Sequence, residues 1–504
     1  MRILLALLLL GSVSGYSQYP RDLKIADADT RSWWQTTEAL SGDSMEGRDT
    51  GSAAYQRAAE YVAGRFRAAG LEAAGDGGSY FQTVAMHQVE VEKKGTSFTV
   101  VREDGTKLAL TFLEDITVAA SAGLKAVDGP LSFRGYCGKE AMQEVRGKVV
   151  VCFGTQRKGL PTGAERVANA RAGGAAALVN VDDPYFSIEP PRWPYAYARS
   201  VTTGARAEGS FAVMRVSAAE FAGLIAGSKQ NPAAVLEGGG RQAALASFEI
   251  PARLEARFAL SEKEISSPNV LAKLPGSDPS LKDEYVVIAA HLDGYGFGTA
   301  VEGDSLYNGA LDDAAYVALL IQFADDLKAQ QKTLKRSILF CAFTGEEKGL
   351  LGSNYFVAHP TVPVAQMAAD INLDQLRPLF PLKMLTALAI DDTSLGATAR
   401  TVGAGMGIEL RGDKEPERGL LRRADHYPFL KAGVPAIGFI FAYEPGTDAE
   451  RRYREWYKVR YHRPQDDVMQ PMDFVAAAKF NLFFYKLVET VADGKRPAML
   501  HGMP

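Results

Sequence analysis

Four uninterrupted apolar runs in the second half of the chain end beside residues that bind metals or transfer protons. Runs of this kind are typical of strands buried on both faces of a parallel sheet. In such a sheet the binding site forms outside the carboxyl ends of the strands. The sequence therefore predicts an α/β fold whose strand ends deliver polar side chains to a shared site. The four runs cover residues 285–290, 337–343, 368–372 and 435–441.

Residues 30–112 predict helices followed by a hairpin. Apolar side chains recur at helical spacing from Ala53 to Ala69, and Gly70 ends the pattern. Residues 98–101 and 108–112 read as strands on either side of an Asp-Gly pair at 104–105, which is the signal of a β-hairpin.

Residues 118–245 differ from the rest of the chain in their pattern of apolar and small residues. Short β-like runs alternate with alanine- and glycine-rich helical stretches such as residues 164–177, and the segment contains no histidine. All clusters of potential metal ligands follow this segment. We therefore interpret it as a module inserted into a domain built from residues 18–117 and 246–504. A continuous doubly wound domain is the alternative interpretation.

The N-terminus has the pattern of a secretory signal. Residues 1–17 combine a basic start, a short apolar core and small residues suited to cleavage, and this core is too short to span a bilayer. We expect an exported protein, periplasmic or extracellular, without stable membrane insertion. The net charge of −4 gives no sign of the clustered basic surface that binds nucleic acid. The sequence does not determine the oligomeric state.

The three cysteines are too few for a disulfide framework. Cys341 lies within an apolar run and is expected to pack as a small hydrophobic side chain. Cys137 and Cys152 could pair in an oxidising compartment, and the sequence leaves this open.

The polar residues at the ends of the apolar runs suit a metal-dependent hydrolase. Asp293 follows His291 by two residues, so its carboxylate can accept the proton of the second ring nitrogen. Asp312 lies just before a predicted helix, where backbone N–H groups favour an anion, and taken alone it would be an N-cap. Glu346 and Glu347 point in different directions from a turn, so one can bind metal while the other acts as a base.

Five residues form the predicted metal-binding set, and Glu346 remains as an acid that is not a ligand. Imidazole and carboxylate ligands without thiolate suit zinc, and five of them suit two cations that share a bridging carboxylate. The predicted ligands are His291, Asp312, Glu347, Asp374 and His462.

The order of these motifs resembles the co-catalytic di-zinc exopeptidases, which include bacterial leucyl-type aminopeptidases and relatives of glutamate carboxypeptidase. This resemblance implies a mixed, mostly parallel central sheet flanked by helices. It also implies that residues 118–245 are an inserted protease-associated domain, with the peptidase domain at 18–117 and 246–504. It rests on His-Leu-Asp at 291–293, Asn-Gly-Ala-Leu-Asp-Asp at 308–313, Gly-Glu-Glu at 345–347, Asn-Leu-Asp at 372–374, Tyr-His-Arg-Pro at 461–464 and Met-Glu-Gly-Arg at 45–48.

The resemblance assigns the metal ligands to two zinc sites. Asp312 would bridge both Zn²⁺ ions. His291 and Asp374 would complete one site, and Glu347 and His462 would complete the other.

The resemblance also assigns roles beside the metals. Glu346 would be the general base, and Asp293 would support His291 without binding metal. Tyr461 would either donate a hydrogen bond to the tetrahedral intermediate or serve in packing. Asp425 and His426 would lie near the substrate pocket or support it structurally.

The sequence departs from the family pattern at two places. Asp312 is followed by Asp313-Ala-Ala-Tyr316 instead of the usual Asn-Ala-Ser-Gly, and Gln375 replaces the usual methionine after Asp374. No ligand is lost, so we expect effects on substrate preference and rate more than on metal binding.

These patterns predict a secreted, zinc-dependent aminopeptidase that releases N-terminal residues from peptides through a metal-bound hydroxide, with Glu346 as general base. A carboxypeptidase or dipeptidase of the same family is the nearest alternative, because Arg377, Arg422 and Arg423 could line a carboxylate pocket. A non-catalytic binding protein on this fold is the third possibility. It is disfavoured because the chain retains all five ligands and the base.

Overall fold

The four apolar runs form four adjacent parallel strands at the centre of the sheet. This computed structural model describes residues 25–204, 209–374 and 376–501. Strands β14, β15 and β18 are buried at every residue, so the prediction of doubly buried parallel strands is confirmed. The spatial order is β18 (Ala436–Phe441), β15 (Met367–Asn372), β11 (Tyr285–His291) and β14 (Ser337–Phe343).

Further strands extend this parallel centre on both sides and make the sheet mixed. On one side β16 (Met384–Leu388) pairs antiparallel with β18, and β17 (Glu409–Arg411) pairs parallel with β16. On the other side the long β10 (Phe248–Leu274) pairs antiparallel with β14 and with the short β1 (Glu72–Ala73).

Alternate residues of the central strands face two different layers of helices. Val286 and Ile288 of β11 pack in one core, and Val287 and Ala289 pack in the core on the opposite face. This is the alternation that a strand buried on both faces must show. The first core contains residues of α1 (Ala28–Ser41), α2 (Ala53–Ala68), α6 (Ala315–Ala329), α8 (Leu395–Ala404), α10 (Asp448–Val459) and α11 (Phe474–Asp493), and the second contains residues of α7 (Leu351–Ala358) and α9 (His426–Lys431).

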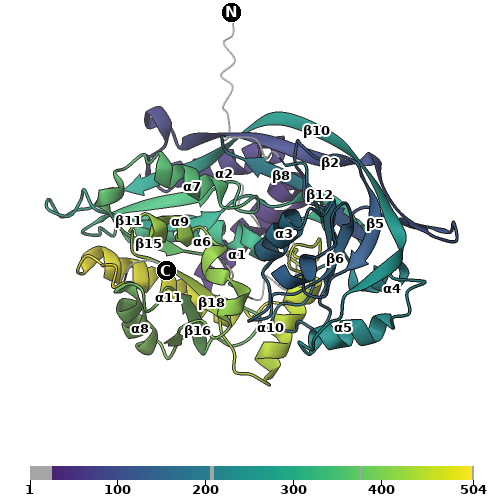
Figure 1. Cartoon of the computed structure of the whole chain (residues 1–504). Helices are drawn as coiled ribbons and strands as arrows, with labels where there is room; N and C mark the ends of the chain where they lie inside the picture. The colour runs from purple at the N-terminus through teal and green to yellow at the C-terminus, as the bar shows by residue number, and fades with distance from the viewer. Residues whose placement is uncertain (1–24, 205–208, 375, 502–504) are drawn as a thin grey trace, which may run out of the picture.

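A long two-stranded ribbon continues the sheet into the rest of the molecule. β2 (Phe81–Arg102) pairs antiparallel with β10, and the two strands arch across the top of the view in Figure 1. The predicted hairpin forms where β2 pairs with β3 (Lys107–Leu110), and Gly105 occupies its turn at φ 83°. β8 (Arg199–Thr202) also pairs with β2, and the β12 (Gly296–Val301) and β13 (Asp304–Tyr307) hairpin lies apart from the main sheet.

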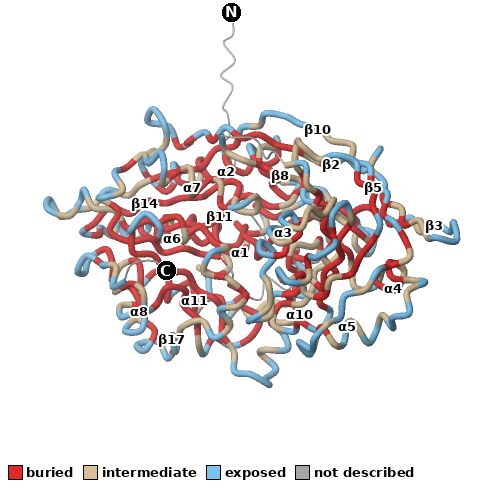
Figure 2. The backbone as a smooth tube through the Cα atoms, viewed as in Figure 1, coloured by how far each residue is buried: buried red, intermediate tan, exposed pale blue. Residues whose placement is uncertain are grey.

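The strands beyond β10 surround a hydrophobic core of their own. Buried residues of this core run from Val89 to Ala256, and Figure 2 shows buried backbone in both halves of the molecule. The core therefore includes residues outside the predicted module at 118–245, whose boundaries stay a prediction. It includes residues of β5 (Val127–Phe133), β6 (Val149–Gly154), β7 (Ala177–Asp182) and β9 (Ala212–Val216) in parallel, of β4 (Ile116–Val118) antiparallel, and of α4 (Phe221–Leu224) and α5 (Pro232–Gly240). α3 (Gly163–Ala172) packs in a smaller cluster around Cys137 and Cys152.

Two expectations about local structure differ in outcome. The helix expected over 53–69 is α2, at Ala53–Ala68. The helical stretch expected over 164–177 is too long, because α3 ends at Ala172 and β7 begins at Ala177. The chain reverses there through Gly174, which has φ 75°.

The predicted signal at 1–17 and the departure at Gln375 lie outside the described residues. Among the described residues, no helix has both the length and the apolar character to cross a membrane.

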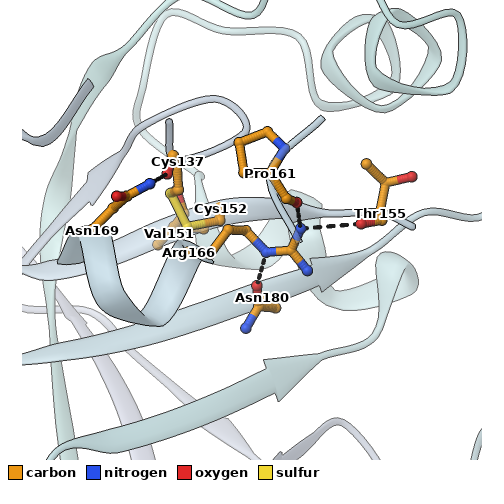
Figure 3. The surroundings of a disulfide bond; sticks show 8 residues. All are labelled: Cys137, Val151, Cys152, Thr155, Pro161, Arg166, Asn169 and Asn180. Atoms are coloured by element: carbon orange, nitrogen blue, oxygen red, sulfur yellow. Dashed lines mark hydrogen bonds between the residues drawn. A yellow bond between two sulfur atoms is a disulfide. The ribbon is translucent and has the colours of Figure 1, made fainter. Parts of the chain in front are cut away.

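Cys137 and Cys152 form a disulfide, which answers the question that the sequence left open (Figure 3). Their Cα atoms are 5.5 Å apart, both residues are fully buried, and the sequence separation is 15. Cys152 lies in β6, so the bond fastens the loop after β5 to a core strand. Cys341 is a buried free thiol, as expected for a hydrophobic packing role.

We expect the double variant Cys137→Ser/Cys152→Ser to lose about 3 kcal/mol of stability in the unfolding step that includes this core, since closing a loop of this length restricts the unfolded chain. Urea titration followed by tryptophan fluorescence and circular dichroism measures the loss. The wild type in reductant is the matched control and should move to the same midpoint. An oxidised wild type that unfolds like the double variant would contradict a stabilising role for this bond.

Candidate metal centre

The five predicted ligands lie together at the carboxyl ends of the central strands. His291 is the last residue of β11, Glu347 follows β14, and Asp374 follows β15. Asp312 lies in the turn before α6, and His462 lies in the loop after α10. Within each of two groups, one potential ligand atom per residue lies within 4.8 Å of the others. The two groups that share Asp312 are His291, Asp312 and Asp374, and Asp312, Glu347 and His462. A third group, His291, Glu346 and Glu347, meets the same distance criterion.

Asp312 belongs to the first two of these groups and presents one oxygen to each. Its Oδ1 lies 3.3 Å from Nε2 of His291, and its Oδ2 lies 3.4 Å from Nε2 of His462. Nε2 of His462 is also 3.2 Å from Oε2 of Glu347. The carboxylate of Asp312 therefore lies between the two imidazoles, which is the arrangement that a bridging ligand requires.

The turn that contains Asp312 is held by Asp466, a residue for which the sequence suggested no role. Its carboxylate accepts the N–H groups of Leu311 and Asp312, both at 3.0 Å, and its carbonyl accepts the N–H of Ala310. The N-cap interpretation of Asp312 is wrong, because α6 begins at Ala315 and its N-cap residue is Ala314. The Asp312 side chain is thus directed to the candidate metal centre and not to the helix.

The carboxylate of Asp293 has partners other than the one expected. Nδ1 of His291 lies 3.1 Å from the backbone carbonyl of Asp293 and 3.8 Å from its carboxylate. That carboxylate accepts the hydroxyl of Thr50 at 2.8 Å and the N–H of Glu346 at 3.0 Å. The chain turns sharply after β11, so the carbonyl reaches the ring first. Asp293 therefore fixes the backbone of Glu346 and supports His291 through its main chain.

Tyr295 is a second residue that the sequence did not single out. Its hydroxyl lies 3.1 Å from Nδ1 of His462, and the two ring centroids are 4.6 Å apart. This contact leaves Nε2 of His462 directed toward Asp312 and Glu347. His462 has φ 54°, so it occupies the left-handed region that non-glycine residues seldom adopt. The nearby His-x-Asp motif gave no separate signal for Tyr295.

Arg48, from the Met-Glu-Gly-Arg motif, joins the N-terminal loop to the site. Its fully buried guanidinium donates to the backbone carbonyls of Leu40, Leu292, Asn308 and Gly309 at 2.7 to 2.9 Å. Leu292 lies in the segment after β11, Asn308 and Gly309 lie in the segment before Asp312, and Leu40 belongs to α1. Arg48 therefore sets the spacing between two of the segments that carry the predicted ligands, a role that the motif alone did not reveal.

The site concentrates negative charge in a buried volume. Burial, together with Asp374 and Glu347, raises the pKa of Glu346 well above its usual value. Burial also raises the pKa of Asp466 to about 6. Asp312 is the exception: burial alone would raise its pKa, but the neighbouring imidazoles of His291 and His462 hold it well below its usual value. The Asp312 carboxylate is thus held in its ionised form.

The arginines that could have lined a carboxylate pocket are not free to do so. Arg377 is fully buried, donates to the carbonyls of Leu311 and Leu376, and lies 4.3 Å from the ring centroid of Trp456. Its Nη2 lies 3.7 Å from Oδ1 of Asp312, so its positive charge acts directly on this carboxylate. Arg423 is engaged by Glu189, and Arg422 is exposed.

Tyr461 and Asp425 lie at the edge of the site. The ring of Tyr461 is buried, and its hydroxyl accepts a hydrogen bond from Arg423 at 3.4 Å. Asp425 accepts the hydroxyl of Ser353 at 2.5 Å, and burial raises its pKa to about 7. His426 is fully buried beside Gly438, so it has a structural environment.

The two residues that depart from the family pattern at 313 and 316 are accommodated. Asp313 accepts the backbone N–H of His291 at 3.1 Å, which places its charge behind that ligand. Tyr316 is buried in α6 and packs edge to face against Phe480. Its bulk therefore occupies the core and not the site.

Comparisons with known proteins agree with this geometry. Residues 269–486 match the model of Peptidase family M28. The chain is 25% identical over 189 residues to leupeptin-inactivating enzyme 1 of Streptomyces exfoliatus, covering 37% of this chain and 39% of that protein. It is 27% identical over 259 residues to a probable zinc metalloprotease of Pyrenophora tritici-repentis, covering 45% and 56%. It is 25% identical over 209 residues to aminopeptidase YwaD of Bacillus subtilis, covering 39% and 41%. The chain thus spans about half, or less, of the length of these curated relatives.

Solved structures show the same fold over nearly the whole chain. An aminopeptidase from Aneurinibacillus sp. strain AM-1 has a TM-score of 0.60 at 18% identity and covers 94% of this chain and 96% of that one. A zinc aminopeptidase from Bacillus subtilis has a TM-score of 0.57 at 18% identity, with 94% and 98% covered. At these identities the likeness concerns the fold alone. The mixed, mostly parallel sheet and the family match agree, and residues 269–486 belong to Peptidase family M28.

Proposed function

We propose that this protein is an exported di-zinc aminopeptidase that removes N-terminal residues from peptides. The observation that carries this proposal is the pair of ligand groups that share Asp312, with Glu346 beside them. Oε2 of Glu346 lies 3.9 Å from Nε2 of His291, so the acid is close to the predicted ligands without being one of the predicted five. The relatives named as an aminopeptidase and as a zinc metalloprotease support the same reaction class.

The residues present suit zinc. Oδ2 of Asp312 and Oε1 of Glu347 are buried and, among the described residues, have no hydrogen-bond partner. A buried carboxylate oxygen without a donor is costly, and a cation satisfies it. Imidazole and carboxylate ligands without thiolate fit Zn²⁺. Asp312 supplies an oxygen to each group, which supports two ions.

The chain's own residues can perform the proton transfers of peptide hydrolysis. Bound zinc would polarise the scissile carbonyl and lower the pKa of an attacking water toward about 7. Glu346 would take the proton of that water and deliver it to the leaving amine. The Asp293 carboxylate accepts the backbone N–H of Glu346, which fixes the position of the Glu346 backbone and thereby of its side-chain carboxylate.

The surplus of carboxylates favours a substrate amine over a substrate carboxylate in the centre. Burial and the charge of Asp374 raise the pKa values of both Glu346 and Asp425. Neither Glu346 nor Asp425 is a predicted ligand, so both can accept hydrogen bonds from a substrate amine beside the proposed cations. This favours the aminopeptidase over the carboxypeptidase.

Export is supported by two separate features. Residues 1–17 have the pattern of a secretory signal, and Cys137 and Cys152 form a disulfide. Disulfides persist in oxidising compartments such as the periplasm and the extracellular medium.

We expect zinc-loaded protein to hydrolyse leucine amides with a free N-terminus and to leave N-acetylated counterparts intact. The acetyl group removes the basic amine that would donate hydrogen bonds to Glu346 and Asp425. Steady-state kinetics on matched free and blocked substrates measures the difference. Equal turnover of both, or exclusive cleavage at a free C-terminus, would refute an aminopeptidase.

We expect Glu346→Gln to retain metal and to lose about 10²- to 10⁴-fold in kcat, since the proton acceptor is removed while the ligands stay. Metal analysis combined with turnover of a leucine amide tests both parts. Glu347→Gln is the matched control, and it should lose metal. Near wild-type turnover in Glu346→Gln would exclude this residue as the base.

We expect Asp312→Ala to lose both metals, because it removes the one side chain common to the two groups. Inductively coupled plasma mass spectrometry on dialysed protein gives the metal content. Asp391→Ala is a suitable control, since that side chain is 74% exposed and pairs with Arg400 on the surface. A variant at 312 that keeps its full metal content would disprove the bridging role.

A further inference from the structure

The segment between β7 and β8, residues 183–198, reaches the residues around the candidate metal centre; we call it the crossing loop. The carbonyl of Ile188 accepts a hydrogen bond from Arg454 of α10, and the carbonyl of Ala196 accepts the N–H of Thr299 at 3.2 Å. Near its end, the ring of Tyr197 lies 5.5 Å from the ring of Tyr295. The crossing loop therefore packs directly against the support of His462.

Two arginines bind Glu189 of the crossing loop. One is Arg423, which precedes α9, and the other is Arg192 of the crossing loop itself. Arg423 places one guanidinium nitrogen 2.9 Å from each of the two carboxylate oxygens. Arg192 lies 3.3 Å from the same carboxylate. Burial opposes ionisation, but the charges of Arg423 and Arg192 hold the pKa of Glu189 below its usual value. One negative charge thus faces two positive charges, and the group retains one net positive charge.

Arg192 is the member of this group that remains available to a ligand. Its guanidinium carbon lies 4.4 Å from the ring centroid of Tyr461, the residue next to the predicted ligand His462. Its Nη1 is buried and, within the described part of the chain, has no hydrogen-bond partner. A buried guanidinium N–H without an acceptor is unusual in native proteins. An anionic ligand group would satisfy it.

Arg192 also lines a cavity large enough for a short peptide. The cavity has a volume of about 490 Å³ and lies at the carboxyl ends of β6 and β7, the usual place for ligands in parallel sheets. The pocket beside Asp312 and His462 measures only about 10 Å³, which is the room of one water. Four arginines and three acids line the large cavity: Arg166, Arg192, Arg199, Arg215, Asp182, Asp183 and Glu189.

We infer that Arg192 is a substrate-binding residue that recognises a carboxylate on the leaving-group side of the peptide. This inference rests on the proposed aminopeptidase function. The substrate amine would lie among the carboxylates at Asp312, and the chain beyond the scissile bond would pass Tyr461 to reach Arg192. The charges of a short peptide with free ends match this polarity. The carboxylate is either the free C-terminus of a dipeptide or an acidic side chain in the second position.

Four substrates distinguish these two sources. They are leucyl-alanine as the free acid and as the amide, and the amides of leucyl-glutamate and leucyl-glutamine. We expect wild-type protein to prefer the carboxylate member of at least one pair. A preference confined to the first pair identifies the C-terminus, and one confined to the second pair identifies the side chain. Both outcomes support carboxylate recognition.

We expect Arg192→Gln to reduce the acid-to-amide ratio of kcat/KM by about 10- to 100-fold, as befits the loss of a charge-assisted hydrogen bond. The loss should lie in KM, because this contact forms equally in the bound substrate and the transition state. Arg192→Lys keeps the charge and should restore part of the ratio. Arg241→Gln is the matched control, since Arg241 is 73% exposed and lies in the same half of the molecule.

A wild type without preference in either pair, or an unchanged ratio in Arg192→Gln, overturns the inference. Failure of the aminopeptidase function gives a different result, namely no turnover of any of the four substrates. In that case calorimetry with a reduced-bond leucyl-alanine analogue, as acid and as amide, decides the point. The inference is supported if Arg192→Gln binds the acid analogue more weakly than the wild type does while the two proteins bind the amide analogue equally. It is refuted if both proteins bind the acid analogue equally.

Discussion

Buried negative charge at the carboxyl ends of β11, β14 and β15 is the constraint on which the rest of the structure depends. Carboxylates in such a volume are stable only where donors or cations compensate them. Arg48 and Arg377 supply permanent positive charge, and both direct hydrogen bonds to backbone carbonyls of the segments around Asp312. The same side chains therefore fix the geometry of the site and reduce its electrostatic cost. Among the buried carboxylate oxygens that have no hydrogen-bond partner in the described residues, Oδ2 of Asp312 and Oε1 of Glu347 are the ones that the proposed cations would satisfy.

The sheet makes this concentration of charge possible because β11 and β14 are apolar along their length and carry polar side chains at their ends. Each of these two strands has one face in each helical layer, so neither can shift by a residue without exchanging its two cores. A fixed register in turn fixes where His291 and Glu347 emerge. Packing of the core is thus what brings side chains distant in sequence to within 4.8 Å of one another.

The sequence predicts the strands and the groups at their ends because both are local patterns: an apolar run and the residues that follow it. It does not predict Asp466, Arg48 or Tyr295 as supports, because their contacts join segments up to 260 residues apart. Nor does it separate the carbonyl of Asp293 from its carboxylate, since both lie two residues from His291 and only the turn decides which reaches the ring. The end of α3 was misplaced for a related reason: alanine continues a helical pattern, and the glycine pair after Ala172 ends it.

The crossing loop connects the part of the molecule built around the core from Val89 to Ala256 with the residues of the proposed metal centre. Tyr197 contacts Tyr295, which supports His462, and it also receives a hydrogen bond from Lys348, the residue after Glu347. Arg199, just beyond the loop, pairs with Asp49 next to Arg48 at 2.6 Å. The position of this part of the molecule is therefore coupled to His462 and Glu347, the two predicted ligands grouped with Asp312, and displacing the loop would remove contacts beside both. A module that only covered the site from outside would need none of these contacts. They therefore argue that the part around the core from Val89 to Ala256 and the part that carries the predicted ligands function together.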